Sequence, residues 1–226
     1  MTTPTSQQPD VPGRDPATPG LPRRTSTIQI LRAAEELFAR HGLGGTTMAA
    51  IADAAGLPKA NLHYYFGSKD LLYRAVLEDI LSTWLGDADV WIVIERTPSE
   101  GLTGYIRAKM AWTRARADAS RIFAGELLAG GHQIRHFLAF DLRAHVQRME
   151  EVFAHWTRAG LMQPVSAPHL LFCIWAMTQS YADFSPQMEA VLGRGNGLRP
   201  DDYEAAVTMI LRMVLAGCAV GDTKVA

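Results

Sequence analysis

The chain has 226 residues, 48% of them hydrophobic, and a net charge of −1. That length can bury a sizeable core, and the hydrophobic fraction is typical of a soluble globular protein. No apolar run approaches the roughly 20 residues of a membrane span and no apolar signal segment opens the chain, so we expect a cytoplasmic protein with no membrane partner.

The charges are unevenly distributed along the chain. Residues 23–75 contain seven Lys or Arg against four Asp or Glu, whereas residues 76–226 contain fourteen against seventeen. The N-terminal part is therefore the basic part, which favours contact with phosphate groups at one end of the molecule.

The first 22 residues contain six of the twelve prolines and almost nothing apolar. We therefore predict a disordered tail over residues 1–22. Arg23 and Arg24 close this tail. They either reach a phosphate or the minor groove of a nucleic acid, as N-terminal arms do, or belong to a solvated linker.

The first helix is predicted to start at residues 25–27 and to run to Arg40, because Gly42 can end it. Its apolar residues recur on one face, which we expect to cover the next two helices. These residues are Ile28, Leu31, Leu37 and Phe38.

Two short helices joined by a tight turn are predicted between Thr46 and Phe66. Small and branched apolar residues follow Thr46 at helical spacing, and the hydroxyl of Thr46 can cap this helix. Gly56 can take the positive φ of a chain reversal, and Pro58 suits the first position of the next helix. This arrangement is a helix-turn-helix.

The second of these helices, roughly Pro58 to Tyr65, exposes an unusual set of side chains. Leu62 and Phe66 can both point into a core, which leaves polar and aromatic residues outside. The outer residues are Lys59, Ala60, Asn61, His63 and Tyr64. Amide and imidazole groups can contact base edges in the major groove while Lys and Tyr reach phosphates. The alternative is a solvated face on a helical hairpin.

From Thr25 to about Leu81 the chain resembles the DNA-binding domain of the TetR family of bacterial repressors. The motifs are ILRAAEELFARHGLGGTTM, IADAAGLPKANLHYYF and SKDLLYRAV. The resemblance implies that the protein binds double-stranded operator DNA. It further implies that Thr47 and Lys69 contact the DNA backbone, with Lys59, Ala60, Asn61, His63 and Tyr64 on the recognition helix. Pro58 departs from the usual Ser or Thr cap.

A fourth helix begins after Ser68, which can cap it, and it repeats apolar residues every four positions up to Trp84. Its position allows it to carry a movement to the DNA-binding end. Further helices are predicted near residues 99–116, 120–129, 133–159, 167–184 and 201–217, with Asp201 and Glu204 as a capping-box-like pair in the last.

The predicted fold is therefore all-α, with about nine helices. A disordered tail (residues 1–22) precedes a three-helix helix-turn-helix DNA-binding domain (residues 23–67), which is followed by a larger helical ligand-binding and dimerisation domain (residues 68–226). The last two helices are apolar over too wide an arc for one packed face, so we expect a two-fold homodimer through a four-helix bundle. Burial within one chain is the alternative. Cys173 and Cys218 are expected to be reduced core residues.

A narrower resemblance, to TetR-type regulators of pyrimidine utilisation, covers nearly all of residues 25–192. It rests on TWL, SRIFAGELLAGG and above all HLLFCIWAMTQSYADF. It implies that Trp175 and Gln179, with Trp84 on a facing helix, bind uracil or thymine, and that this ligand releases DNA. Two alternatives stay open: a Trp and a Gln satisfied by protein partners, or a carboxylate such as Glu126 beside Arg121 that selects a cationic ligand.

Nothing in the sequence indicates catalysis. It contains no nucleophile motif, phosphate-binding loop or metal-ligand cluster, and His132 and His136 lack a third ligand. We therefore expect no catalytic residues, no metal and no cofactor. The expected function is that of a ligand-responsive transcriptional regulator, with a regulator that answers to another ligand or to none as the alternative.

Overall fold

In the computed structural model, which describes residues 21–219, every regular element is a helix, as predicted. Residues 1–20, where most of the predicted tail falls, lie outside the described residues. The helices are α1 (Leu21–Gly45), α2 (Met48–Ala55), α3 (Lys59–Phe66), α4 (Lys69–Trp91), α5 (Pro98–Ala115), α6 (Ala117–Leu128), α7 (Arg135–Phe137), the π-helical η1 (Leu138–Leu142), α8 (Arg143–Arg158), α9 (Ala167–Asp183), α10 (Ser185–Leu192) and α11 (Pro200–Gly217).

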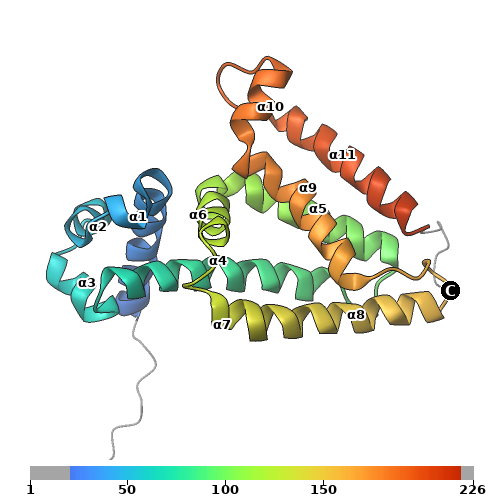
Figure 1. The fold of residues 1–226 in the computed structure, drawn as a ribbon, viewed down its shortest axis with the longest axis horizontal. Coiled ribbons are helices and arrows are strands. Elements are labelled where there is room, and N and C mark those ends of the chain that lie inside the picture. The colour runs from blue at the N-terminus through green and yellow to red at the C-terminus, as the bar shows by residue number, and fades with distance from the viewer. Residues whose placement is uncertain (1–20, 220–226) are drawn as a thin grey trace, which may run out of the picture.

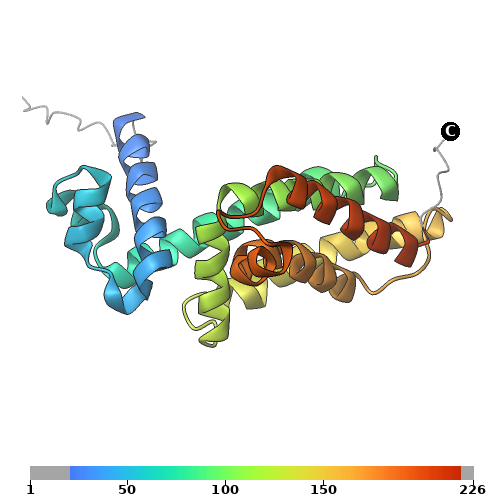
Figure 2. The ribbon, with the colours of Figure 1, turned by 90° about the horizontal axis from the view of Figure 1, so that it is seen from above.

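Helices α1 to α3 form one end of the molecule, and α4 runs from them along much of its length (Figure 1). Helices α5, α8, α9 and α11 gather around the far part of α4. Seen from above, α6 lies between the three N-terminal helices and this larger group (Figure 2). Two elements therefore connect the two ends: α4, which belongs to both, and α6, which packs against α1.

Helix α1 starts at Leu21, earlier than predicted, and is interrupted at Gly42, where φ is 67° and ψ is 175°. The glycine therefore ends the regular helix where expected. The predicted apolar face is wrong at Ile28, which is 59% exposed, whereas Ile30 and Ala34 are fully buried. The buried face is rotated because α1 packs against α6 as well as α2 and α4.

The turn of the helix-turn-helix forms at Gly56, whose φ of 64° and ψ of 30° place it in the left-handed region. The cap of α2 differs from the prediction by one residue: the Thr47 side chain accepts the Ala50 N–H, at 3.1 Å. Thr46 is instead buried and donates its hydroxyl hydrogen bond to backbone carbonyls of α1. Ser68 caps α4 as predicted, since its Oγ accepts the Leu71 N–H.

Buried hydrophobic residues form two clusters. The first combines α1–α3 and the first part of α4 with Ile122 and Phe123 of α6. The second holds α5, α8, α9 and α11 together around the last part of α4. Because α6 contributes to the core of the N-terminal helices, a displacement of α6 must disturb the packing at that end.

Helices α4 and α5 approach closely at Gly104. A Cβ atom at this position would lie 1.9 Å from Cε3 of Trp91, so only glycine leaves room for the indole ring. This close approach sets Lys109, further along α5, against the ring of Trp84 on α4.

Three expectations for the C-terminal helices need correction. The helix predicted over residues 133–159 is divided into α7, η1 and α8, and α10 was not predicted. The capping pair of α11 also differs from the predicted Asp201 and Glu204: the carboxylate of Asp202 accepts a hydrogen bond from the backbone N–H of Arg199. The π-helical turn inserts an extra residue, a feature that periodicity over a long window cannot resolve.

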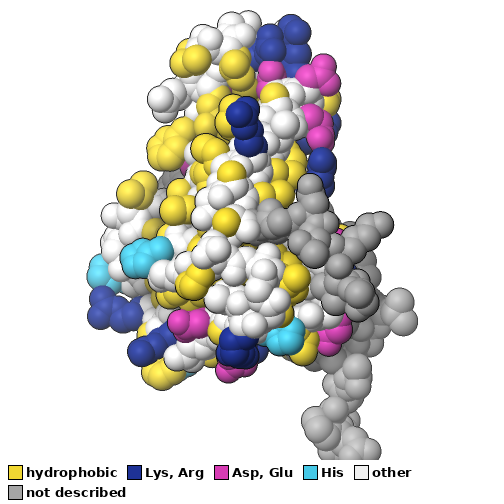
Figure 3. All heavy atoms as spheres, turned by 90° about the vertical axis from the view of Figure 1, so that its right-hand side faces the viewer, with side chains coloured by type: hydrophobic (Ala, Val, Ile, Leu, Met, Phe, Trp, Pro, Cys, Tyr) yellow, Lys and Arg dark blue, Asp and Glu magenta, His cyan; other side chains and the backbone are white. Residues whose placement is uncertain are grey.

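The apolar residues of α9 and α11 divide into two sets. Leu171, Ile174 and Val214 are buried within the chain, whereas Phe172, Met209 and Met213 are 50–54% exposed. Hydrophobic side chains also lie at the surface between charged ones on the end of the molecule opposite the helix-turn-helix (Figure 3). Cys218 is buried and Cys173 is exposed, so the expectation of two core cysteines is wrong for Cys173, which faces outward from α9.

Candidate functional site

Helix α3 presents the side chains predicted for DNA contact. Only Leu62 is fully buried on this helix, and Phe66 packs partly against the core. Lys59, Ala60, His63 and Tyr64 are exposed, and Asn61 is half-buried. No side chain caps the start of α3 at Pro58, so the first N–H groups of this helix have no side-chain acceptor there.

The imidazole of His63 has a defined orientation. Its Nδ1 lies 3.0 Å from the carbonyl oxygen of Gly67. A carbonyl oxygen can only accept, so Nδ1 carries the hydrogen, and Nε2 of the neutral ring is an acceptor. In the major groove, such a nitrogen can accept from the amino group of adenine or cytosine.

Lys69 and Thr47 lie at the beginnings of their helices. Lys69 Nζ donates to the carbonyl oxygen of Thr46, at 2.9 Å, which ties the start of α4 to the start of α2. The Thr47 hydroxyl is exposed and uses only its acceptor in capping α2, which leaves its hydrogen to donate. Lys69 therefore has a structural partner that sequence reasoning did not foresee, although an ammonium group has two further hydrogens.

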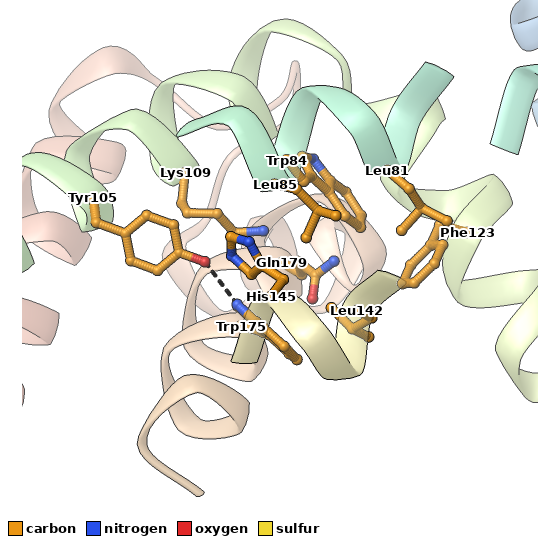
Figure 4. A pocket seen from close by; sticks show the side chains of 10 residues that line it. All are labelled: Leu81, Trp84, Leu85, Tyr105, Lys109, Phe123, Leu142, His145, Trp175 and Gln179. Atoms are coloured by element: carbon orange, nitrogen blue, oxygen red, sulfur yellow. Dashed lines mark hydrogen bonds between the residues drawn. The ribbon is translucent and has the colours of Figure 1, made fainter. Parts of the chain in front are cut away.

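A cavity of about 40 Å³ lies within the helices of the larger group (Figure 4). Five helices and η1 supply its walls. The lining residues are Leu81, Trp84 and Leu85 of α4, Tyr105 and Lys109 of α5, Phe123 of α6, Leu142 of η1, His145 of α8, and Trp175 and Gln179 of α9.

All three residues predicted for ligand contact, Trp84, Trp175 and Gln179, line this one cavity. They come from α4 and α9, which the sequence separates by about ninety positions. The indole N–H of Trp175 is already used, since Nε1 donates to the Tyr105 hydroxyl at 2.7 Å. This is the one hydrogen bond drawn among the ten lining residues in Figure 4, so the Gln179 amide is not engaged by any of them.

Lys109 is a lining residue that sequence reasoning missed. It is 3% exposed, and its Nζ lies 4.3 Å from the centroid of the Trp84 ring. Burial lowers its pKa from 10.5 to about 7, while the charges of Asp87 and Asp183 act in the opposite direction. The signal was available: Lys109 stands four residues after the buried Tyr105 and beside the buried Met110, on the apolar face of α5.

His145 is a second missed residue of the cavity wall. It is 1% exposed, and its Nδ1 lies 3.3 Å from Asp89 and 3.1 Å from Arg148. Burial lowers its pKa, against the charge of Asp89, which raises it. With Nδ1 occupied, Nε2 is the ring nitrogen left for a ligand.

Glu126 and Arg121 lie elsewhere. They line a separate groove between α1 and α6, where Glu126 accepts the Gln133 N–H at 2.8 Å. Glu126 therefore does not line the cavity that holds Trp84, Trp175 and Gln179. His132 and His136 are exposed, and no group of three or more His, Cys, Asp or Glu within residues 21–219 is arranged to hold a metal ion.

An aromatic and ionic chain connects the cavity to α1. The Trp84 ring contacts Trp112, with centroids 5.0 Å apart, and the Arg116 guanidinium lies 5.1 Å from the Trp112 centroid. Arg116 in turn forms ion pairs with Glu35 of α1 and, at 3.0 Å, with Asp79 of α4. Arg116, Glu35 and Asp79 are called the Arg116 cluster below.

Comparison with known protein families gives two matches that together cover residues 30–221. Residues 30–76 match the bacterial regulatory proteins of the tetR family. Residues 77–221 match the C-terminal region of YcdC-like protein. Within the described residues, no helix combines the length and the apolar character that crossing a membrane requires.

The chain is similar to curated regulators over most of its length. It is 42% identical to the HTH-type transcriptional regulator RutR of Escherichia coli (strain K12) over 164 residues, which are 73% of this chain and 77% of that protein. It is 25% identical to the HTH-type transcriptional repressor SCO4008 of Streptomyces coelicolor, covering 83% and 93% of the two chains. A solved regulator of the tetR family from Rhodococcus RHA1 shares the fold, with a TM-score of 0.67 at 16% identity over 87% of this chain and 98% of that one.

Proposed function

Since the chain belongs to the TetR family of bacterial transcriptional regulators, we propose that it is a repressor that leaves its operator when a pyrimidine base fills the α4–α9 cavity. Members of this family bind operator DNA and small-molecule effectors, typically as dimers. In this proposal residues 23–67 bind DNA, and residues 68–226 bind the effector and form the dimer.

The exposed face of α9 and α11 supports a two-fold dimer. Large apolar side chains that a monomer would leave in water, Phe172, Met209 and Met213, lie on these two helices. Pairing two copies through this face builds a four-helix bundle and removes that surface from solvent. Each copy then supplies one α3, so the operator is a roughly palindromic duplex read in two successive major-groove segments.

Substitutions on α3 are expected to separate phosphate contact from base recognition. Lys59→Gln should weaken binding to every duplex and reduce the slope of log affinity against log salt by about one. Asn61→Ala should instead relax preference at one base pair, at a cost of about 1 to 3 kcal/mol for the preferred base. Fluorescence anisotropy with operator variants over a salt series measures both effects.

Arg158→Gln is the matched control, because it removes one exposed cation at the end of α8 far from the helix-turn-helix (Figure 1). It should leave the salt slope unchanged. Equal slopes for wild type and Lys59→Gln would contradict the assignment of Lys59.

The hydrogen-bonding character of the cavity carries the effector proposal. Within residues 21–219 no carboxylate lines it, whereas Tyr105, Lys109 and Gln179 offer hydrogens from its wall. A ligand rich in acceptors matches such a wall, and uracil and thymine each present two carbonyl oxygens on a small planar ring. Gln179 supplies the acceptor that a ring N–H needs, and the indoles of Trp84 and Trp175 supply flat apolar surface.

Gln179→Leu is expected to weaken uracil and thymine binding about tenfold or more. Leucine keeps most of the volume but leaves the polar edge of the ring unpaired, at a cost of roughly 1 to 3 kcal/mol. Isothermal titration calorimetry of the two proteins measures the change, and operator binding without ligand should be nearly unaffected. Wild-type protein that neither binds these bases nor releases DNA with them would rule out a pyrimidine effector.

The second candidate is a regulator of the same family that responds to another ligand or to none. The Trp175–Tyr105 hydrogen bond favours this candidate, because it already pairs two polar groups of the cavity wall with each other and not with a ligand. A thermal-shift screen of small heterocycles separates the candidates, because a ligand that binds only the native state raises the melting temperature.

A further inference from the structure

Lys109 is a buried lysine at the wall of the cavity, with no hydrogen-bond acceptor for its ammonium group in the part of the chain that the structure describes. It is almost completely buried, no hydrogen bond of its Nζ is seen among the described residues, and the centroid of the Trp84 ring lies 4.3 Å from Nζ. Figure 4 shows its side chain reaching from α5 into the space between Tyr105, His145 and Trp84. A buried ammonium without an acceptor is costly, so the position needs a reason.

We propose that Lys109 is a specificity-determining residue that donates, as an ammonium ion, to a ring carbonyl oxygen of an uncharged effector. The assignment rests on the proposed function and adds to it the charge class of the ligand and the group that recognises it. Charge-assisted hydrogen bonds are about twice as strong as neutral ones, so this one contact distinguishes a carbonyl from a ring lacking it.

The groups that face Lys109 favour an uncharged ligand. Asp87 on α4 and Asp183 on α9 both act on it through their charges. His145 on α8 and Tyr105 on α5 share its cavity, and α6 contributes Ser120, which donates to Asp183 at 2.6 Å. Two carboxylates already balance one ammonium, so a ligand carboxylate placed here would meet net repulsion.

Effector binding should therefore take up a proton. In the free protein the pKa of Lys109 is about 7 because of burial. An acceptor oxygen stabilises the charged form and raises that pKa in the complex. Because the pKa is higher in the complex, the affinity for the ligand is greatest at pH values below the pKa of the free protein and falls as the pH rises above it. Uracil affinity should thus fall about tenfold from pH 6 to pH 8.

The test is calorimetry of wild-type protein with uracil, in phosphate and in Tris at pH 8, and in phosphate and in MES at pH 6. The difference in heat between buffers gives the protons taken up, and we expect about 0.9 per uracil at pH 8 and about 0.1 at pH 6. Uracil that binds with no uptake at pH 8 would overturn the role of Lys109 while leaving the pyrimidine proposal intact. No binding at all would overturn both.

Two variants and one further ligand complete the test. Lys109→Met should bind uracil at least tenfold more weakly and take up no proton, whereas Gln179→Leu should bind weakly with its uptake preserved. Uptake that persists in Lys109→Met would assign the proton to His145 and overturn the proposal. Orotate, a pyrimidine with a carboxylate, should bind more weakly than uracil, and tighter binding would overturn the uncharged class.

Discussion

Lys109→Met is expected to stabilise the ligand-free protein by about 4 kcal/mol at pH 7. In the unfolded chain this lysine is charged, whereas burial lowers its pKa from 10.5 to about 7 in the folded state. Each pKa unit corresponds to about 1.4 kcal/mol, so burying this lysine lowers the free energy of unfolding at pH 7 by about 4 kcal/mol. Methionine has a similar length, carries no charge and suits an apolar wall.

The stability difference between Lys109→Met and wild type should depend on pH. Because the folded pKa is the lower one, the wild-type protein gains stability as the pH rises from about 7 to 10.5. The advantage of Lys109→Met should therefore shrink with rising pH, to about 2 kcal/mol at pH 9. Urea unfolding of both proteins at pH 7 and pH 9, at one fixed protein concentration, measures it.

Lys59→Met is the matched control, since Lys59 is exposed on α3 and the substitution is chemically the same. It should change the free energy of unfolding by no more than about 0.5 kcal/mol at either pH. A destabilised Lys109→Met protein at pH 7 would mean that Trp84, Asp87 and Asp183 already hold the ammonium favourably without ligand. A Lys109→Met protein that is more stable but no longer binds the effector would show that the wild-type lysine lowers stability in order to bind the ligand.

The helices of the DNA-binding end could be predicted closely because their signals are local. Gly56 and Ser68 mark a reversal and a cap through their own backbone and side-chain chemistry. Thr46 and Thr47 could not be told apart in this way, since both are hydroxyl residues before the same helix. What separates them is tertiary: the hydroxyl of Thr46 is used by carbonyls of α1 and its own carbonyl by Lys69.

The cavity depends on contacts between distant segments, so pattern alone located only part of it. Trp84, Trp175 and Gln179 came from a family resemblance, and the structure brings them together in one cavity. Lys109 and Glu35 were passed over because a charged residue in a helix is usually solvated. Both nevertheless lie on apolar helix faces: Lys109 is near the buried Tyr105 and Met110, and Glu35 is near the buried Ala34 and Phe38. A charged residue at a position that faces the core was the sequence signal for both.

Arg116→Met is expected to destabilise the protein by about 3 kcal/mol, because it leaves Glu35 buried without a cation. The side chains of Arg116 and Glu35 are only 12% and 8% exposed, and Nε of Arg116 adds a hydrogen bond of 3.3 Å to the same carboxylate. The double variant Arg116→Met, Glu35→Leu should recover much of the loss, since it removes both charges together. Arg107→Met is the control: its partner Glu204 and Arg107 itself are more than half exposed, so the change should be below about 1 kcal/mol.

The same double variant should weaken the effect of the ligand on DNA. Arg116 follows Trp112, which contacts the cavity residue Trp84, and it binds α1 and α4 at once through the Arg116 cluster. A ligand that moves Trp84 can therefore displace the cluster and, with it, the helix that supports α2 and α3. Coupling is the ratio of operator affinities with and without uracil, and it must equal the ratio of uracil affinities with and without operator. We expect both ratios to fall together in the folded double variant; unchanged ratios would mean that α4 alone carries the signal.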